Sequence, residues 1–190
     1  MHVDISVVGG LALPLLAAHL IADHPLQPSS WAAAKGSCDH AGRVACAKHV
    51  AVVVGLQALA VLAVVGLTGV AVSPLAVVAG LALTAWSHYW ADRRYTLAGL
   101  YEVLGRTEFA RLGTPRPGRD DNPSLGTGAY RMDQDWHHLW LAISALVIAA
   151  PAGPVLAVLT TATAVLMAAS ITASRWGRRT QHRTAETTTA

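Results

Sequence analysis

Apolar residues lie in long unbroken blocks along this chain, separated by short polar segments. The blocks are apolar on every side of a helix, unlike the one-sided stripe of a soluble helix. A bilayer is crossed by about 20 predominantly apolar helical residues. The pattern therefore predicts an all-α integral membrane helical bundle, a single domain over residues 1–176. Its five expected transmembrane helices cover 5–22, 44–67, 74–91, 136–150 and 155–174.

Two segments outside these blocks have patterns of their own. Within 96–132, apolar residues of 96–112 share one helical face, which predicts an amphipathic helix at the cytoplasmic membrane surface. Residues 113–128 are rich in Gly, Pro and Asp, which is typical of a loop. The tail, 177–190, is basic and then Thr-rich, and we expect it to be disordered.

Composition supports the membrane interpretation. Hydrophobic residues make up 53% of the 190 residues and charged residues only 13%, whereas soluble domains carry roughly 25% charged residues. An Ala-rich soluble bundle is the alternative, but its helices would carry apolar residues in a stripe along one face instead of in unbroken blocks. Cys38 and Cys46 are too few for a disulfide framework.

Positive charges are confined to one side of the expected topology. All 14 Lys and Arg residues fall in the segments 23–43 and 92–133, in the tail, or in the adjacent helix ends. The positive-inside rule then places the N-terminus outside and the C-terminus in the cytoplasm, across the inner (plasma) membrane. The basic residues thus indicate topology and a lipid bilayer as partner, with no nucleic acid expected; a homo-oligomer stays open.

Aromatic residues gather on the same side. They fit a belt at the membrane interface. The belt would comprise Trp31, Trp90, Trp136, Trp140 and Trp176.

Histidine and aspartate recur four residues apart at the cytoplasmic ends of the expected helices. Residues four apart share a helical face. The pairs are His19/Asp23, His88/Asp92 and Asp133/His137, and His49 opens the second helix. Polar groups at one depth in four helices would meet if those helices pack as neighbours, and ionisable groups inside a membrane are a functional hypothesis.

Imidazole and carboxylate are ligands that suit Zn²⁺, Mn²⁺ or Fe²⁺. The expected metal ligands are His19, Asp23, His49, His88, Asp92, Asp133 and His137. Gln134 and His138 are expected to support them, and Asp92 and Asp133 to take part in catalysis. The leading hypothesis is a divalent-metal site whose activity is hydrolysis of a lipid-like or membrane-delivered substrate.

Two other interpretations stay open. The pairs would be structural if they only tie four helices together by hydrogen bonds, each contributing on the order of 1 kcal/mol. Chains of Asp and His also serve ion or proton pathways. The protein would then be non-enzymatic, a small channel or transporter or a partner-binding scaffold.

A set of short motifs in the same order resembles a known family. The motifs are AHLIADHPLQP at 18–28 with Trp31 and Lys35, then His49, HYWAD at 88–92 and MDQDWHH at 132–138. They resemble the bacterial and phage membrane family called domain of unknown function 3307, over residues 11–150. His24 departs from the pattern, since an aromatic residue is common there. The resemblance supports the set of site residues but implies no activity; the likeness to metal-dependent membrane hydrolases is an analogy.

Overall fold

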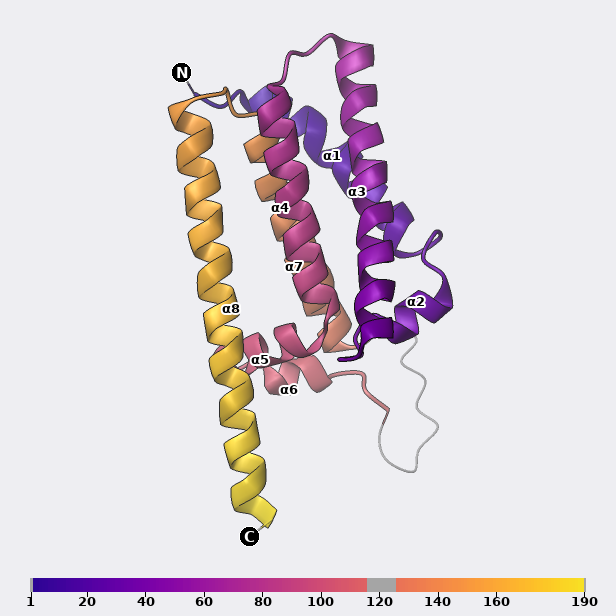
Figure 1. The fold of residues 1–190 in the computed structure, drawn as a ribbon, viewed down its shortest axis with the longest axis vertical. Coiled ribbons are helices and arrows are strands. Elements are labelled where there is room, and N and C mark those ends of the chain that lie inside the picture. Colours follow the sequence, from indigo (N-terminus) through magenta and orange to yellow (C-terminus); the bar gives the residue numbers. More distant parts are fainter. Residues whose placement is uncertain (1, 116–125, 190) are drawn as a thin grey trace.

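The computed structural model describes residues 2–115 and 126–189, and in that part the chain is all-helical (Figure 1). Residues 116–125 of the expected loop lie outside the described part. The elements are α1 (Ile5–Asp23), α2 (Ser29–Ala34), α3 (His40–Thr68), α4 (Pro74–Asp92), α5 (Tyr95–Val103), α6 (Thr107–Arg111), α7 (Gly128–Ile148) and α8 (Pro154–Thr189).

Local sequence signals set the helix ends. The Asp39 side chain accepts a hydrogen bond from the Gly42 amide and caps α3, and Ser73 caps α4 just before Pro74. Both are preferred N-cap residue types, and proline fits the first turn. Gly69, with φ +68°, ends α3 in the left-handed conformation that glycine adopts without a steric cost.

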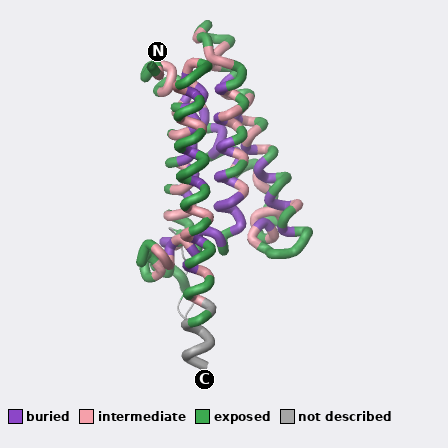
Figure 2. The backbone as a smooth tube through the Cα atoms, turned by 60° about the vertical axis from the view of Figure 1, so that its left-hand side comes forward, coloured by how far each residue is buried: buried purple, intermediate pink, exposed green. Residues whose placement is uncertain are grey.

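Four long helices form the bundle core. α1 packs on α3 and α7, and α4 packs on α7 and α3, while α8 lies beside the bundle and packs mainly against α5. Buried residues follow the inner sides of the helices and exposed ones the outer sides (Figure 2). A buried hydrogen bond of 2.9 Å joins Thr84 of α4 to Ser144 of α7.

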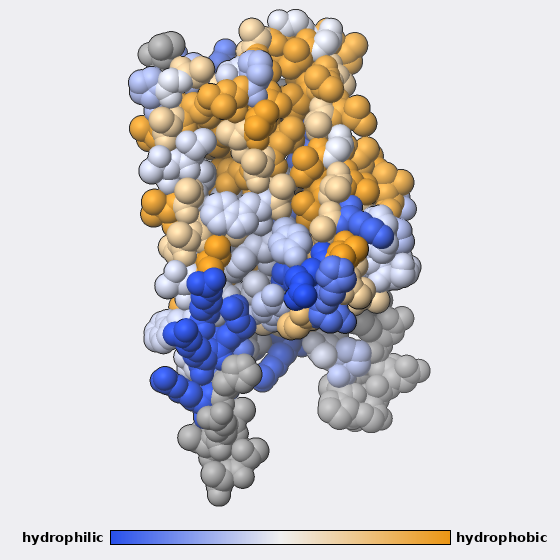
Figure 3. Space-filling view, viewed as in Figure 1, coloured by the Kyte–Doolittle hydropathy of each residue, from blue (hydrophilic) through white to orange (hydrophobic). Residues whose placement is uncertain are grey.

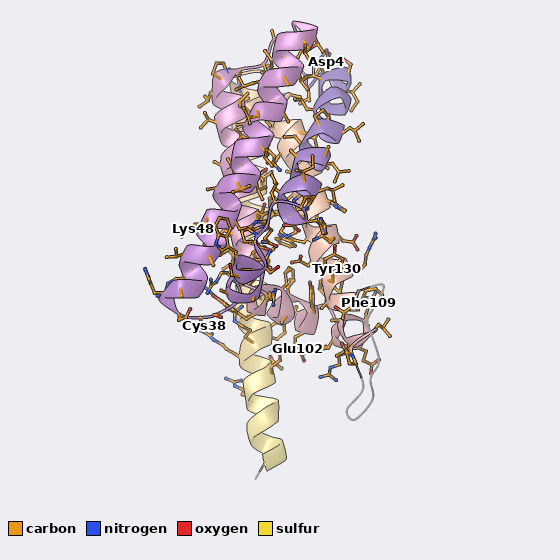
Figure 4. All side chains as sticks on the ribbon, turned by 90° about the vertical axis from the view of Figure 1, so that its right-hand side faces the viewer. Asp4, Cys38, Lys48, Glu102, Phe109 and Tyr130 are labelled. Carbon is orange, nitrogen blue, oxygen red and sulfur yellow. The ribbon has the colours of Figure 1, made fainter. Side chains whose placement is uncertain are left out.

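The two ends of the bundle differ in chemistry. The N-terminus and the links α3–α4 and α7–α8 lie at one end, and α2, α5 and α6 at the other (Figure 1). Hydrophobic side chains cover most of the surface near the first end, and hydrophilic side chains gather near the second (Figure 3). Asp4 lies near the first end, whereas Cys38, Glu102 and Tyr130 lie toward the second (Figure 4). We call the second end the polar end.

Three helices are long and apolar enough to cross a membrane: α1, α3 and the Pro154–Gln181 part of α8. The sequence prediction of further spans at 74–91 and 136–150 corresponds to α4 and α7, which are not among these three. Both helices carry His and Asp residues at the polar end, and these lower their apolar character.

Three expectations differ from the structure. The single amphipathic helix expected over 96–112 is two short helices, α5 and α6, separated at Gly105, which has φ +64°. The tail expected to be disordered continues α8 as far as Thr189. The aromatic belt is partly interior, because Trp90 and Trp140 are buried and the Trp136 ring lies between them, at centroid distances of 4.7 and 5.6 Å.

Candidate metal centre

The structure brings all seven expected ligand residues into one cluster at the polar end. α1 supplies His19 and Asp23, and α3 supplies His49. The pair His88/Asp92 comes from the last turns of α4 and the pair Asp133/His137 from the first turns of α7. The antiparallel arrangement makes these positions meet, since α1 and α4 end where α3 and α7 begin. Their roles as ligands or catalysts stay predictions.

Three ligand atoms, from His49, His88 and Asp92, lie close together, and an oxygen of Asp23 lies beside two of them. The His49 Nε2 atom is 2.9 Å from Asp23 Oδ1, 3.0 Å from His88 Nε2 and 3.4 Å from Asp92 Oδ2. The His88 Nε2 atom is 3.3 Å from Asp92 Oδ2 and 3.6 Å from Asp23 Oδ1. A tetrahedral ion with ligand bonds of about 2.0–2.1 Å separates its ligands by about 3.3 Å. The three separations among His49, His88 and Asp92 therefore fit three of the four ligand positions of one tetrahedral metal ion.

A second group shares Asp92 with the first. The His137 Nε2 atom lies 3.8 Å from Asp92 Oδ1 and 3.6 Å from Asp133 Oδ2. One ligand atom from each of these residues lies within 4.8 Å of the others. Asp92 thus directs Oδ2 toward the first group and Oδ1 toward both His137 and Lys35.

Several buried polar atoms of the cluster lack a well-formed hydrogen bond. Both nitrogens of His19 are in this state, as are His137 Nε2, His138 Nε2 and Asp92 Oδ2. His19 is 0% exposed, and its ring centroid lies 5.1 Å from that of His137 and 5.4 Å from that of His88. An unpaired buried polar group costs about 1–3 kcal/mol, and a bound ion or water is one way in which such atoms are satisfied.

Neighbouring amides orient the expected ligands. Gln134, as expected, contacts two of them: its Nε2 atom donates to Asp23 Oδ2 at 3.1 Å and to Asp133 Oδ2 at 3.4 Å. The side-chain oxygen of Gln27, in the amide orientation that gives both of its ends a partner, lies 3.0 Å from His49 Nδ1 and 3.2 Å from His49 Nε2. Outer-shell contacts of this kind commonly orient metal-binding histidines.

Comparison with protein families gives a clear result. Residues 11–166 match the family described as protein of unknown function (DUF3307). The chain belongs to this family. The match extends past residue 150, where the resemblance noted in the sequence ended, into α8. Comparisons with curated proteins and with solved structures find no match.

The sequence of this DUF3307 chain did not lead us to predict that a lysine, Lys35, contacts the cluster through Asp92. Lys35, just after α2, is 7% exposed, and its Nζ atom lies 2.8 Å from Asp92 Oδ1. The Gln27 oxygen also accepts from Lys35 Nζ, at 3.1 Å. Arg93 holds this segment in place, donating from Nη1 to the Lys35 carbonyl at 2.9 Å and from Nη2 to the Ser37 carbonyl. Loop residues have no helical spacing to reveal them, although the family motif includes Lys35.

A cavity of about 590 Å³ opens beside the cluster in this DUF3307 protein. Asp23, Asp92 and Asp133 are among the residues that line it. Tyr101 of α5 lines it as well, and burial together with the nearby Asp133 and Asp135 raises the pKa of this phenol, which therefore stays a neutral hydrogen-bond donor at neutral pH. The cavity gives a bound molecule direct access to the carboxylates of the cluster.

Proposed function

We propose that this DUF3307 chain is an integral membrane protein that binds a divalent metal ion in its His/Asp cluster and hydrolyses a substrate in the adjoining cavity. The observation that carries the proposal is the set of three ligand atoms from His49 of α3 and from His88 and Asp92 of α4, with mutual separations of 3.0–3.4 Å and with Asp23 of α1 beside them. Hydrogen-bonded pairs that only tie helices together need no common centre, whereas metal ligands do.

Charge supports a divalent ion. Asp23, Asp92 and Asp133 contribute three carboxylates, and Lys35 is the cation in contact with them. With neutral imidazoles, two negative charges stay uncompensated in a nearly dry site, which is costly. One divalent cation would balance them. Imidazole and carboxylate together suit Zn²⁺, Mn²⁺ or Fe²⁺.

The residues divide between holding the ion and serving the reaction. His49 and His88 are 0% and 2% exposed, and with Asp23 and Asp92 they would hold the metal. Asp133 has a side chain 24% exposed that lines the cavity, so it is placed to accept a proton from an attacking water. A divalent metal bound here would supply a Lewis acid that polarises the substrate and activates that water. Hydrolysis would add the water across an ester or amide bond and release an alcohol or amine.

Orientation in the membrane follows from the same end-to-end asymmetry. We propose that α4 and α7 cross the membrane with α1, α3 and α8, since the five helices run between the same two ends of the bundle. The Lys and Arg residues lie near the polar end, which the positive-inside rule assigns to the cytoplasm. The metal site would then lie at the cytoplasmic interface of the inner membrane, with the N-terminus outside.

Metal analysis of the detergent-purified chain tests the proposal. We expect at least one equivalent of Zn, Mn or Fe per chain by elemental analysis, and its loss in the Asp92→Asn and His88→Gln variants. Asp135→Asn is the matched control, because the exposed Asp135 pairs with Arg131 outside the cluster. Wild-type protein without metal, combined with cluster variants that are folded but less stable, would support a structural role instead. Ion flux in liposomes by metal-free protein would support a channel.

A further inference from the structure

The cavity beside the cluster has a second set of charges, distinct from the carboxylates. Three basic side chains line it: Lys35 at the inner end, Arg94 at the α4–α5 turn and Arg111 at the end of α6. The two arginines are exposed residues from different elements. Guanidinium groups bind phosphate and carboxylate oxygens through paired hydrogen bonds, so they indicate an anionic ligand.

Arg94 is held in an unusual backbone conformation. It is the one non-glycine residue with a positive φ, 56°, among the described residues. Such a conformation costs on the order of 1–3 kcal/mol and clusters at functional sites. Its Nη2 atom donates to the Ala32 carbonyl at 2.8 Å, which holds the guanidinium beside α2. The turn thus has an energetically costly backbone conformation, and it places the Arg94 cation on the wall of the cavity.

The wall that α5 and α6 provide also carries apolar side chains, between Arg94 at the start of α5 and Arg111 at the end of α6. Leu97, Ala98 and Tyr101 of α5 and Ala110 of α6 line the cavity there. These side chains offer contact to an apolar group but no charge. One molecule that satisfies both walls carries an anionic head and an aliphatic chain.

We propose that the cavity binds a phosphomonoester on an aliphatic chain, with its phosphate facing Lys35, Arg94 and Arg111 and its chain along the α5–α6 wall. This inference rests on the proposed function. The three lining carboxylates Asp23, Asp92 and Asp133 balance the three basic groups, so a bound divalent metal would leave two uncompensated positive charges. A phosphomonoester carries a charge of about −1.5 to −2 near pH 7, whereas a carboxylate or a phosphodiester carries about −1.

Binding of short, soluble probes to the full chain in a nonionic detergent tests the proposal. Isothermal titration would compare hexyl phosphate, inorganic phosphate and hexyltrimethylammonium, with the metal content of each sample measured in parallel. We expect hexyl phosphate to bind more tightly than inorganic phosphate and the ammonium probe not to bind. Equal affinity for the two phosphates would overturn the aliphatic part of the proposal, and binding of the ammonium probe would overturn the anionic part.

Arginine variants locate the binding site. We expect Arg94→Gln and Arg111→Gln each to weaken hexyl phosphate binding about tenfold or more, because each removes a charge-assisted hydrogen bond. Arg106→Gln is the matched control, since Arg106 is exposed and lies outside the cavity lining. Variants that bind as tightly as wild type would overturn the assignment.

The metal measurement separates this inference from the proposed function. If the chain holds metal but does not bind hexyl phosphate, the substrate class is wrong and the metal site stands. If no metal is found while hexyl phosphate binding still depends on Arg94 and Arg111, the anion site stands without the metal centre.

Discussion

The imidazole of His49 contacts both the other expected ligands and the side chain of Gln27. Its Nε2 atom lies 3.0 Å from His88 Nε2, while the Gln27 oxygen lies 3.0 Å from its Nδ1 atom and 3.2 Å from its Nε2 atom. Removing such an outer-shell partner typically lowers metal affinity about 10- to 100-fold. We expect Gln27→Ala to weaken metal binding by that factor without abolishing it, as measured by competition with a chelating dye.

A second glutamine on the cavity wall provides the comparison. Gln181 also lines the cavity, but its Nε2 atom bonds Glu102 at 3.2 Å. Gln181→Ala should therefore leave metal affinity at the wild-type value. If Gln27→Ala binds metal as tightly as this control does, Gln27 does not orient His49, and the metal proposal would have to stand on the ligand geometry alone.

Helical spacing explains why most of the cluster was predictable from sequence and part of it was not. The two members of each pair, His19/Asp23 and His88/Asp92, are four residues apart, so helix geometry alone predicts that they share a face. Gln27 and Lys35 lie in an irregular segment around α2, whose path depends on Arg93 far along the chain. The distance between His49 and His88 could not be predicted from sequence, because it depends on how α3 packs on α4.

Among the helices, α5 and α8 bring their backbones so close together that a side chain would not fit between them at two glycine positions. A Cβ atom added at Gly99 would lie far inside van der Waals contact with the Ser174 carbonyl, and one at Gly177 would meet the Gly99 carbonyl. The Ser174 hydroxyl, in turn, donates to the Thr96 carbonyl at 2.6 Å. Small residues thus let two backbones pack together, as is common between membrane helices.

We expect Gly99→Ala to destabilise the protein by about 1–3 kcal/mol, because the added methyl group forces the two helices apart. Thermal unfolding in detergent would measure this as a lower Tm. Metal content at low temperature should stay unchanged, since α1, α3, α4 and α7 supply the ligands. Gly55→Ala in α3 is the control, because nothing lies within 4 Å of its added Cβ atom. An unchanged Tm for Gly99→Ala would mean that α8 moves freely against α5.

The break between α5 and α6 could not be predicted from the apolar pattern of the sequence. Apolar periodicity identified residues 96–112 as one amphipathic helix, yet the chain bends at Gly105 and forms α5 and α6. The bend lets α6 pack on α7 while α5 packs on α8. A single glycine inside an amphipathic pattern is compatible with either arrangement, so the tertiary contacts decide.

At the scale of the whole molecule, the two ends are expected to face different compartments, and the two native cysteines offer a direct test. Cys38, between α2 and α3 at the polar end, is exposed, whereas Cys46 inside α3 is buried. We expect a membrane-impermeant maleimide to label Cys38 in inside-out vesicles and not in right-side-out vesicles. Cys46 should react only after denaturation, so each native chain should gain one label.

A cysteine at the opposite end makes this experiment decisive. Ala71, in the link between α3 and α4, is exposed. In the Cys38→Ser background, Ala71→Cys should be labelled in right-side-out vesicles and protected in inside-out ones, because α3 would cross the bilayer between the two positions. Labelling of both positions from the same side would mean that α3 does not span the membrane. The cluster could then be a metal site of a helical bundle, but it could not receive its substrate at a membrane interface by the route proposed above.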